Sequence, residues 1–294
     1  MQRVFVGDVQ GCAEELEALL ARVERRVGEH ELWLVGDVVN RGPASLRALT
    51  LVRERVERGR ARLVLGNHEL ALLRTALGLR PLAAGDTFGD VLASGDLEAW
   101  VEWLRRQPLV ETGTLAGTPF AMVHAAVHPD WDLAALGDAA REAERRLAHP
   151  DRDVARALLA ADPAADADLD VLARLVSCRS VRDDGSWSAE EPGPGARAWH
   201  AAWRARRHGY GVVYGHWSVQ GLVVEEGLRG IDTGCVHHGR GRDGWLTAWV
   251  PDARPDPFGL PDTRFLQERA HARYVLEPED AAEAARQRAR RNGD

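Results

Sequence analysis

The chain has 294 residues, of which 45% are hydrophobic and 28% charged, and this composition is typical of a soluble globular protein with a full core. Its formal charge of −7 argues against general binding to nucleic acid or to anionic membranes. Every basic residue is Arg. An acidic chain that handles phosphate must therefore concentrate positive charge locally, through bound metals and a few Arg side chains.

Three cysteines, Cys12, Cys178 and Cys235, lie far apart in the sequence and form no Cys-x-x-Cys pair. Their spacing predicts neither a disulfide framework nor a zinc knuckle, and it fits a reducing cytoplasm. Residues 1–3 lead directly into a predicted strand, so we expect no signal peptide. No apolar stretch approaches the length of a membrane span.

Strand-helix units repeat over the first third of the chain. Short apolar runs at 3–6, 31–35 and 62–65 each end at a glycine, and the stretches between them carry apolar residues at helical spacing. This alternation predicts parallel strands joined by right-handed crossovers. In such a sheet the ligand site lies beyond the carboxyl ends of the strands.

The middle of the chain has a different pattern. Residues 70–110, with a glycine-rich break at 85–95, are predicted to be largely helical, and so are the Ala- and Arg-rich residues 133–176. We interpret both stretches as insertions that cover the site. Residues 183–195, rich in Gly, Pro, Ser and Glu, are predicted to form a loop.

Strand patterns return in the last third of the chain. Residues 211–214 and 245–250 are predicted strands, and residues 222–224 and 228–231 are predicted to pair as a hairpin. The charged, alanine-rich tail at 278–294 is expected to fray. No composition shift marks a boundary, so we expect one domain over the whole chain.

Four glycine turns that follow apolar runs each carry a metal-type ligand. They are Gly-Asp-Val-Gln-Gly at 7–11, Gly-Asp-Val-Val-Asn-Arg-Gly at 36–42, Gly-Asn-His-Glu at 66–69 and Gly-His at 215–216. A fifth ligand, His124, follows another apolar run. Each turn taken alone is usually structural. Their joint occurrence, each after a strand, predicts a cluster of oxygen and nitrogen donors that can hold two divalent metals.

A divalent metal that activates water needs hard oxygen donors and imidazoles. Asp8 and Asp37 can supply carboxylates, Asn67 an amide oxygen, and His124 and His216 ring nitrogens. Two cations close together can lower the pKa of a shared water and hold the attacking and leaving oxygens of a displacement at phosphorus. We expect Asp37 to bridge the two metals.

Charge that develops on phosphate oxygens can be neutralised by a planar guanidinium. Arg41 is the first candidate because it shares a loop with Asp37, and Arg179 and Arg182 are candidates for the other half of the clamp. His68 directly follows a metal ligand and can face the leaving group as general acid.

Taken together, these motifs resemble the metallophosphoesterases of the phosphoprotein-phosphatase type. The more specific resemblance is to the bacterial symmetrical bis(5'-nucleosyl)-tetraphosphatases, which hydrolyse diadenosine tetraphosphate. It rests on the stretches 103–109, 128–132, 215–217 and 232–235. The resemblance covers nearly the whole chain to about residue 250.

The resemblance implies an α/β fold of two stacked mixed β-sheets flanked by helices, with the metals at one edge. It also implies His68 as the acid and Arg41 as the phosphate clamp. The ligand set that it implies is Asp8 and Asp37 for the first metal, and Asp37, Asn67, His124 and His216 for the second.

Two positions depart from the superfamily pattern. Gln10 stands where histidine is usual, and its weaker neutral oxygen implies a loosely held first metal, although glutamine also occurs in the tetraphosphatase subfamily. Asn40 stands where protein phosphatases have an aspartate that orients the acid, and asparagine cannot stabilise an imidazolium. Our hypothesis is that acid assistance matters less here because a nucleoside diphosphate leaves more readily than an alkoxide. We expect Asn40 and Asp232 to lie behind the ligands.

The expected activity is symmetrical cleavage of diadenosine tetraphosphate to two ADP, with other dinucleoside polyphosphates and RNA capped by them as further substrates. Mn²⁺ is the expected metal, with Co²⁺ or Mg²⁺ as alternatives. Trp131 and Trp217 are candidates to stack on adenine, although both can instead wedge the inserted helices onto the sheets. We expect no DNA or membrane partner.

Two other functions share parts of this pattern. A protein serine/threonine phosphatase has the same metal loops, but Asn40 and the long insertions argue against it. An inactive dinucleotide-binding sensor is suggested by Gln10. The oligomeric state is left open by the sequence.

Overall fold

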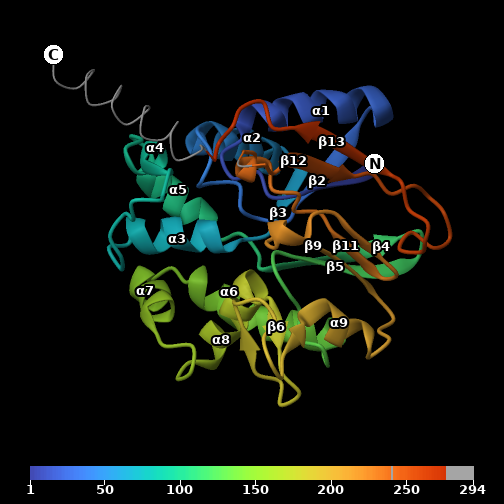
Figure 1. The fold of residues 1–294 in the computed structure, drawn as a ribbon. Coiled ribbons are helices and arrows are strands. Elements are labelled where there is room, and N and C mark those ends of the chain that lie inside the picture. The colour runs from blue at the N-terminus through green and yellow to red at the C-terminus, as the bar shows by residue number, and fades with distance from the viewer. Residues whose placement is uncertain (240, 276–294) are drawn as a thin grey trace.

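The computed structural model describes residues 1–239 and 241–275, and it consists of two stacked β-sheets flanked by helices (Figure 1). Both sheets mix parallel and antiparallel strands, which confirms the predicted fold class. The tail at 278–294, which was expected to fray, lies outside the described residues.

The first sheet has five strands in the order β13-β12-β1-β2-β3. Its three N-terminal strands are parallel, as the alternating pattern predicted: β1 (Gln2–Val6), β2 (His30–Leu34) and β3 (Ala61–Leu63). The strands β12 (Trp245–Trp249) and β13 (Phe265–Arg269) add to the β1 edge in antiparallel fashion. Helices α1 (Ala13–Val27) and α2 (Ser45–Glu57) connect the parallel strands and lie on the outer side of the sheet (Figure 1).

The second sheet also has five strands, in the order β10-β11-β9-β5-β4. They are β4 (Val110–Leu115), β5 (Thr118–Val123), β9 (Gly211–Tyr214), β10 (Val223–Glu225) and β11 (Leu228–Gly230). The central strands β5, β9 and β11 are parallel, whereas β10 pairs with β11 as the predicted hairpin. The parallel strands therefore end together, as they do in the first sheet.

An aromatic core joins the two sheets. Phe5 of β1 lies 5.3 Å from Phe120 of β5 between ring centroids, and 5.2 Å from Trp249 of β12. These rings and that of Trp33 are almost completely buried. Burial of each such side chain contributes about 1.5–3 kcal/mol, so this layer fixes the sheets against each other.

The middle of the chain is mostly helical. The helices are α3 (Asn67–Ala76), α4 (Gly89–Leu92), α5 (Leu97–Leu104), α6 (Leu133–Leu147), α7 (Arg152–Ala160), α8 (Ala167–Ser177) and α9 (Trp199–Arg204). The predicted break at 85–95 contains the short helix α4, where Val91 is buried against the core. Helices α6 to α9 lie beneath the second sheet in Figure 1.

A third, small sheet corrects the expected loop at 183–195. Three two-residue strands, β6 (Ser180–Val181), β7 (Trp187–Ser188) and β8 (Arg197–Ala198), pair in the order β7-β6-β8. The Gly- and Pro-rich composition hid β7, whose residue Trp187 is held by a hydrogen bond from its indole nitrogen to Asp170 at 2.7 Å.

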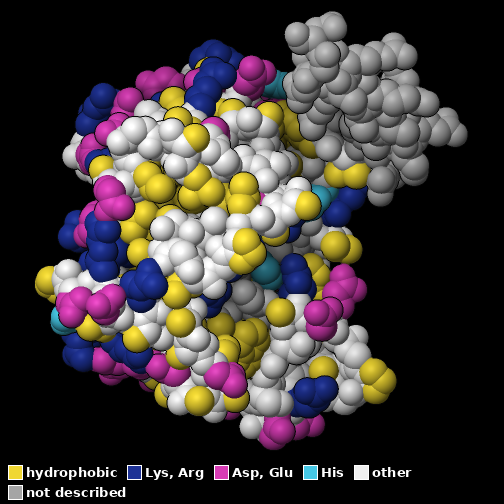
Figure 2. Space-filling model, turned by 90° about the vertical axis from the view of Figure 1, so that its left-hand side faces the viewer, with side chains coloured by type: hydrophobic (Ala, Val, Ile, Leu, Met, Phe, Trp, Pro, Cys, Tyr) yellow, Lys and Arg dark blue, Asp and Glu magenta, His cyan; other side chains and the backbone are white. Residues whose placement is uncertain are grey.

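The surface and the helices give two further observations. On the face drawn in Figure 2, basic and acidic side chains intersperse instead of forming one continuous basic stripe. Among the residues that the structure describes, no helix combines the length and apolarity needed to cross a bilayer.

Candidate metal centre

The predicted ligands come together at the strand ends of both sheets. The amide oxygen of Asn67 lies 3.1 Å from Nε2 of His124 and 2.9 Å from Nδ1 of His216. Oδ2 of Asp37 lies 3.4 Å from Nε2 of His124. Asp8, Asp37 and His124 each offer a ligand atom within 4.8 Å of the others. Five side chains that are up to 208 positions apart therefore share one small volume.

Backbone carbonyls orient both histidines toward this volume. Nδ1 of His124 lies 2.8 Å from the carbonyl oxygen of Val35, and Nε2 of His216 lies 3.1 Å from that of Ser177. A carbonyl can only accept a hydrogen bond, so each of these nitrogens donates and carries the ring proton of the neutral imidazole. The opposite nitrogens, Nε2 of His124 and Nδ1 of His216, are left with lone pairs that face the cluster, as in metal-binding histidines.

The cluster contains more buried carboxylates than buried positive charge. Burial and the charges of Asp232 and Asp37 raise the pKa of Asp8 well above its usual range. Burial likewise raises the pKa of Asp232 to about 6, with Asp37 adding to the effect. Carboxylates that destabilise one another in this way are relieved by a cation, which is the arrangement that a divalent metal requires.

Gln10 supplies a second sign that a cation fits. Its side-chain oxygen Oε1 is buried and finds no hydrogen-bond partner among the described residues. A buried polar atom without a partner is rare and calls for a ligand or water. Carboxylate and amide oxygens together with imidazoles form a donor set that suits divalent metals. Asp8, Asp37, Asn67, His124 and His216, with Gln10 at the edge, are the residues that can hold them.

The backbone is strained at this centre. Seven non-glycine residues in the described part of the chain have a positive φ, and five of them are Gln10, Asp37, Asn40, Arg41 and His216, with φ between 49° and 78°. Such conformations cost about 1–3 kcal/mol each and persist where the surrounding structure holds them. Their concentration here indicates that the rest of the fold offsets the strain of placing the ligands.

Two glycines allow the ligands to approach neighbouring backbone. A Cβ atom on Gly66 would lie 2.2 Å from Oδ1 of Asp37, and a Cβ atom on Gly215 would lie 2.0 Å from Oδ1 of Asp8. Neither position can accept a side chain without displacing a carboxylate. The glycines of the motifs are thus required by close packing against the ligands.

Glu69 is a positioning residue to which the sequence patterns gave no role. Its buried carboxylate accepts hydrogen bonds from the backbone nitrogens of Asp37 at 2.8 Å, Gly66 at 2.9 Å, Val38 at 2.8 Å and Val39 at 3.2 Å. One side chain therefore ties the loop after β2 to the start of α3. Its place in the Gly-Asn-His-Glu motif was the available signal.

His68 and Arg41 are linked by Asn40. The side-chain oxygen of Asn40 accepts hydrogen bonds from the backbone nitrogens of Arg41 and Thr87, both at 2.9 Å. Its amide nitrogen consequently faces Nδ1 of His68 at 2.9 Å and Oδ1 of Asp86 at 3.0 Å. The guanidinium of Arg41 is exposed and donates to the carbonyl of Gly85 at 3.0 Å. The loop 83–87 thus orients both side chains, and Asp86 was not predicted.

The two candidate arginines of the small sheet differ in position. Arg179 is half-buried, and its guanidinium donates to the carbonyl oxygen of Ala189 at 2.6 Å. Burial lowers the pKa of His216, and the charges of His124 and Arg179 lower it further. Arg182 is exposed and lines a separate small pocket with His128. Of the two, Arg179 is the one whose charge acts on a predicted ligand.

Two further residues near the centre, His237 and Arg242, were not predicted. Burial lowers the pKa of His237 to about 4, and the charges of Arg242, Arg41 and His68 add to this shift. The charges of Arg242 and Arg41 thus both act on His237. His237 and Arg242 follow Asp232, whose stretch carried the only sequence signal for this region.

The two tryptophans proposed to stack on adenine are placed differently. Trp131 is half-buried and stacks on His128 with 5.0 Å between ring centroids. Trp217 is 7% exposed and packs against His200 in the core, which leaves it little surface for a ligand.

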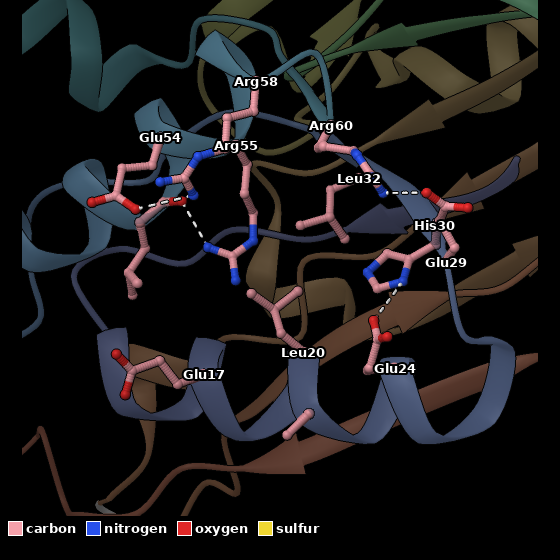
Figure 3. A pocket seen from close by; sticks show the side chains of 12 residues that line it. Glu17, Leu20, Glu24, Glu29, His30, Leu32, Glu54, Arg55, Arg58 and Arg60 are labelled. Atoms are coloured by element: carbon pink, nitrogen blue, oxygen red, sulfur yellow. Dashed lines mark hydrogen bonds and ion pairs between the residues drawn. The ribbon is translucent and has the colours of Figure 1, made fainter.

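A large pocket lies away from this centre. It lies between α1 and α2 (Figure 3). Its volume is about 760 Å³. His30 and Leu32, at the start of β2, line it, whereas Asp37 follows the end of the same strand. Its charged side chains largely satisfy one another, as in the Arg60–Glu29 pair at 2.7 Å, so we do not assign the chemistry to it.

Comparisons with known proteins show which family this chain is similar to. The model of the calcineurin-like phosphoesterases matches residues 1–173. A symmetrical bis(5'-nucleosyl)-tetraphosphatase of Ralstonia nicotianae is 38% identical over 251 residues, covering 80% of this chain and 86% of that protein. One of Janthinobacterium sp. is 36% identical over 258 residues, covering 82% and 91%.

The fold is also found among solved structures. One described as a "putative diadenosine tetraphosphatase" superposes with a TM-score of 0.58 at 23% identity, covering 92% of this chain and 93% of that one. At this identity the likeness concerns the fold alone. The family model and the two tetraphosphatases are similar to this chain in sequence as well. The chain therefore belongs to the calcineurin-like phosphoesterase family.

Proposed function

We propose that this protein hydrolyses diadenosine tetraphosphate symmetrically to two ADP, in the cytoplasm and with two divalent metals. The convergence of Asp8, Asp37, Asn67, His124 and His216 on one volume is the observation that carries the metal-dependent chemistry. The substrate rests on the curated relatives, which are named for symmetrical cleavage and match about four fifths of the chain.

Two cations bound to these ligands would lower the pKa of a water molecule and withdraw charge from the phosphate oxygens. The protein's own groups would bind and orient the polyphosphate around them. Arg41, exposed beside the centre, would hold the oxygens of the phosphate under attack. Arg179 is our choice for the other half of the clamp, because its charge acts on His216 whereas Arg182 is directed to another pocket.

His68 would assist the departure of the leaving group. Because Asn40 donates to Nδ1 of His68, that nitrogen accepts, and in the neutral ring the proton resides on Nε2. Nε2 lies 3.6 Å from Oδ2 of Asp37 and is therefore on the reacting side. Burial lowers the pKa of His68, although the charge of Asp37 opposes this. A neutral Nε2–H group can stabilise a departing ADP oxygen by a hydrogen bond.

Further parts of the proposal concern the metal and the range of substrates. Mixed nitrogen and oxygen donors favour Mn²⁺ or Co²⁺ over Mg²⁺. Other dinucleoside polyphosphates, and RNA ends capped by them, present the same phosphate chain and are proposed as additional substrates. Half-buried Trp131 is the better placed of the two tryptophans to contact a base. The aromatic core shared by both sheets supports one catalytic domain.

Product analysis tests this function. Purified protein with Mn²⁺ is incubated with diadenosine tetraphosphate, and the nucleotides are separated by chromatography. ADP as the sole product supports the proposal, whereas ATP with AMP rejects symmetrical cleavage. A phosphopeptide run in parallel distinguishes a protein phosphatase. Dinucleotide binding without any product at saturating Mn²⁺ would identify an inactive sensor instead.

A further inference from the structure

A second group of metal-type ligands lies outside the phosphoesterase centre. Cys12 is the residue that precedes α1, Glu15 lies in the first turn of that helix, and Cys235 begins the short 3₁₀-helix η2 (Cys235–His237). Each offers a ligand atom within 4.8 Å of the other two. All three residues are at most 1% exposed. The fold thus joins two cysteines that are 223 positions apart in a chain without any Cys-x-x-Cys pair.

Glu15 has the surroundings of a metal ligand. Its Oε1 accepts hydrogen bonds from the backbone nitrogen of His271 at 2.7 Å and from the hydroxyl of Tyr274 at 2.5 Å. Its other oxygen, Oε2, is buried and has no hydrogen-bond partner among the described residues. Within the same residues no Arg or His forms an ion pair with Glu15. A buried carboxylate is normally paired with a cation or coordinates a metal.

The donor set indicates which cation would fit. Two cysteine sulfurs and one carboxylate oxygen suit a thiophilic divalent ion such as Zn²⁺. Donors around tetrahedral zinc lie about 3.5–4 Å apart, so small movements of the three side chains would bring three donors to the cation, and a water molecule would supply the fourth. The hydrogen bonds from His271 and Tyr274 hold the carboxylate in place, as groups behind metal ligands do.

We propose that Cys12, Glu15 and Cys235 form a structural site for one zinc-like cation, separate from the catalytic metals. Each thiol releases its proton to solvent as its sulfur binds. The cation would tie the start of α1 to η2, and through Glu15 to the segment 271–274. This structural role holds whichever substrate the phosphoesterase centre cleaves.

The position of the site suggests what the cation would stabilise. Cys12 lies two residues after Gln10, and Cys235 lies three residues after Asp232. Both of these neighbours belong to the phosphoesterase centre. Because the site is fully enclosed, the cation would enter while the chain folds. A bound metal would therefore raise the unfolding temperature, since it binds the folded state alone.

Cobalt spectroscopy distinguishes the two metal centres. Protein is produced in cells grown in cobalt-supplemented medium, and its absorption is recorded. Thiolate-to-cobalt charge transfer gives a near-ultraviolet band that nitrogen and oxygen ligands do not produce. We expect this band in the unaltered protein and in the control Cys178→Ser, whose buried cysteine lies outside the cluster. Cys12→Ser and Cys235→Ser should lose it.

Metal analysis of zinc-grown protein gives an independent readout. We expect Glu15→Gln, which keeps the shape of the side chain and removes its charge, to lose one equivalent of zinc and to unfold several degrees lower. The hydrolytic metals should remain. Absence of the charge-transfer band from folded protein whose other centre holds cobalt would overturn the proposal. A Cys12–Cys235 disulfide, detected as a mass lower by two hydrogens, would overturn it as well.

Discussion

The amide nitrogen of Asn40 lies 2.9 Å from Nδ1 of His68 and donates its hydrogen to that ring nitrogen. The same amide donates to Oδ1 of Asp86 at 3.0 Å. The Nδ1 side of the histidine is therefore held by a neutral group, and the carboxylate of Asp86 is reached from it only through Asn40. This arrangement suits a reaction whose leaving group is stable as an anion.

Replacement of Asn40 by aspartate tests that interpretation. Asn40→Asp alone would place the new carboxylate against that of Asp86. We expect it to lower the hydrolysis of both diadenosine tetraphosphate and an aryl phosphate. The double variant Asn40→Asp/Asp86→Asn restores a donor between them and lets the new carboxylate stabilise a protonated His68. We expect it to accelerate aryl phosphate hydrolysis roughly 100-fold, the low end for a positioned acid, while the dinucleotide changes little.

Steady-state kinetics on both substrates measures the difference. Asp86→Asn alone serves as the control, since it keeps the neutral Asn40 and should not favour the aryl phosphate. Equal gains of the double variant on the two substrates would refute the role assigned to Asn40.

Glu69 should matter for stability as much as for metal binding. Glutamine in its place offers one acceptor oxygen to four backbone N–H groups and turns an N–H group toward the rest. We expect Glu69→Gln to lower the free energy of unfolding by about 2 kcal/mol or more, from the unsatisfied donors. Urea unfolding measures it, with the exposed Glu57→Gln as control. Identical curves for the two variants would contradict the assignment.

Gly215 should be essential for the position of Asp8. A Cβ atom there would lie 2.0 Å from Oδ1 of Asp8, so Gly215→Ala must displace the carboxylate. We expect metal affinity to fall about 10- to 100-fold, as for displaced ligand geometry in general, with the overall fold kept. Isothermal titration with Mn²⁺ measures this. Gly209→Ala, whose Cβ atom meets nothing within 4 Å, should bind as the unaltered protein does.

Asp262 should make the free energy of unfolding depend on pH in the acidic range. It is buried and paired with Arg229 at 2.8 Å and Arg264 at 2.6 Å. Burial raises its pKa, but hydrogen bonds from Arg264 and the charge of Arg229 outweigh burial and bring the pKa to about 2. A folded-state pKa below the ordinary value of about 3.9 stabilises the fold above that value, and the contribution disappears as the pH falls toward 2.

Asp262→Asn should therefore lower the free energy of unfolding by about 3 kcal/mol or more at pH 7, because the buried guanidinium of Arg229 loses its counterion, whereas Arg264 keeps its pair with Asp252. The difference in the free energy of unfolding between this variant and the unaltered protein should stay constant above about pH 5 and shrink between about pH 4 and 2. Urea unfolding over this range measures it. As a control, Asp252→Asn removes the exposed carboxylate that also pairs with Arg264. It should change the free energy of unfolding by no more than about 1 kcal/mol. A difference that grows on acidification would contradict a lowered pKa for Asp262.

The sequence pattern predicted the strands that are buried and end at a glycine turn. The apolar runs before Gly7, Gly36 and Gly66 became parallel strands because each is short, buried and ended by a tight turn. The strands β4 and β13 were not predicted, because both are largely half-exposed and lack a clear alternation. The two-residue strands of the third sheet exist only through their pairing, which no local pattern reveals.

The residues of the two sites likewise divide into those that a local motif predicted and those that it did not. Asp8, Asp37 and His216 could be predicted because each follows a glycine turn after a strand. Asp86 and Glu15 could not, since their partners are fixed by contacts 46 and 259 positions away. The contacts of these two side chains with distant segments form only in the folded chain, and no local motif marks them.

Anomalous diffraction from crystals soaked in Mn²⁺ tests the two-metal centre most directly. We predict two manganese peaks that share the carboxylate of Asp37, one of them also bound by Asn67, His124 and His216. A single peak, or peaks away from Asp37, would contradict a dinuclear site built on these residues.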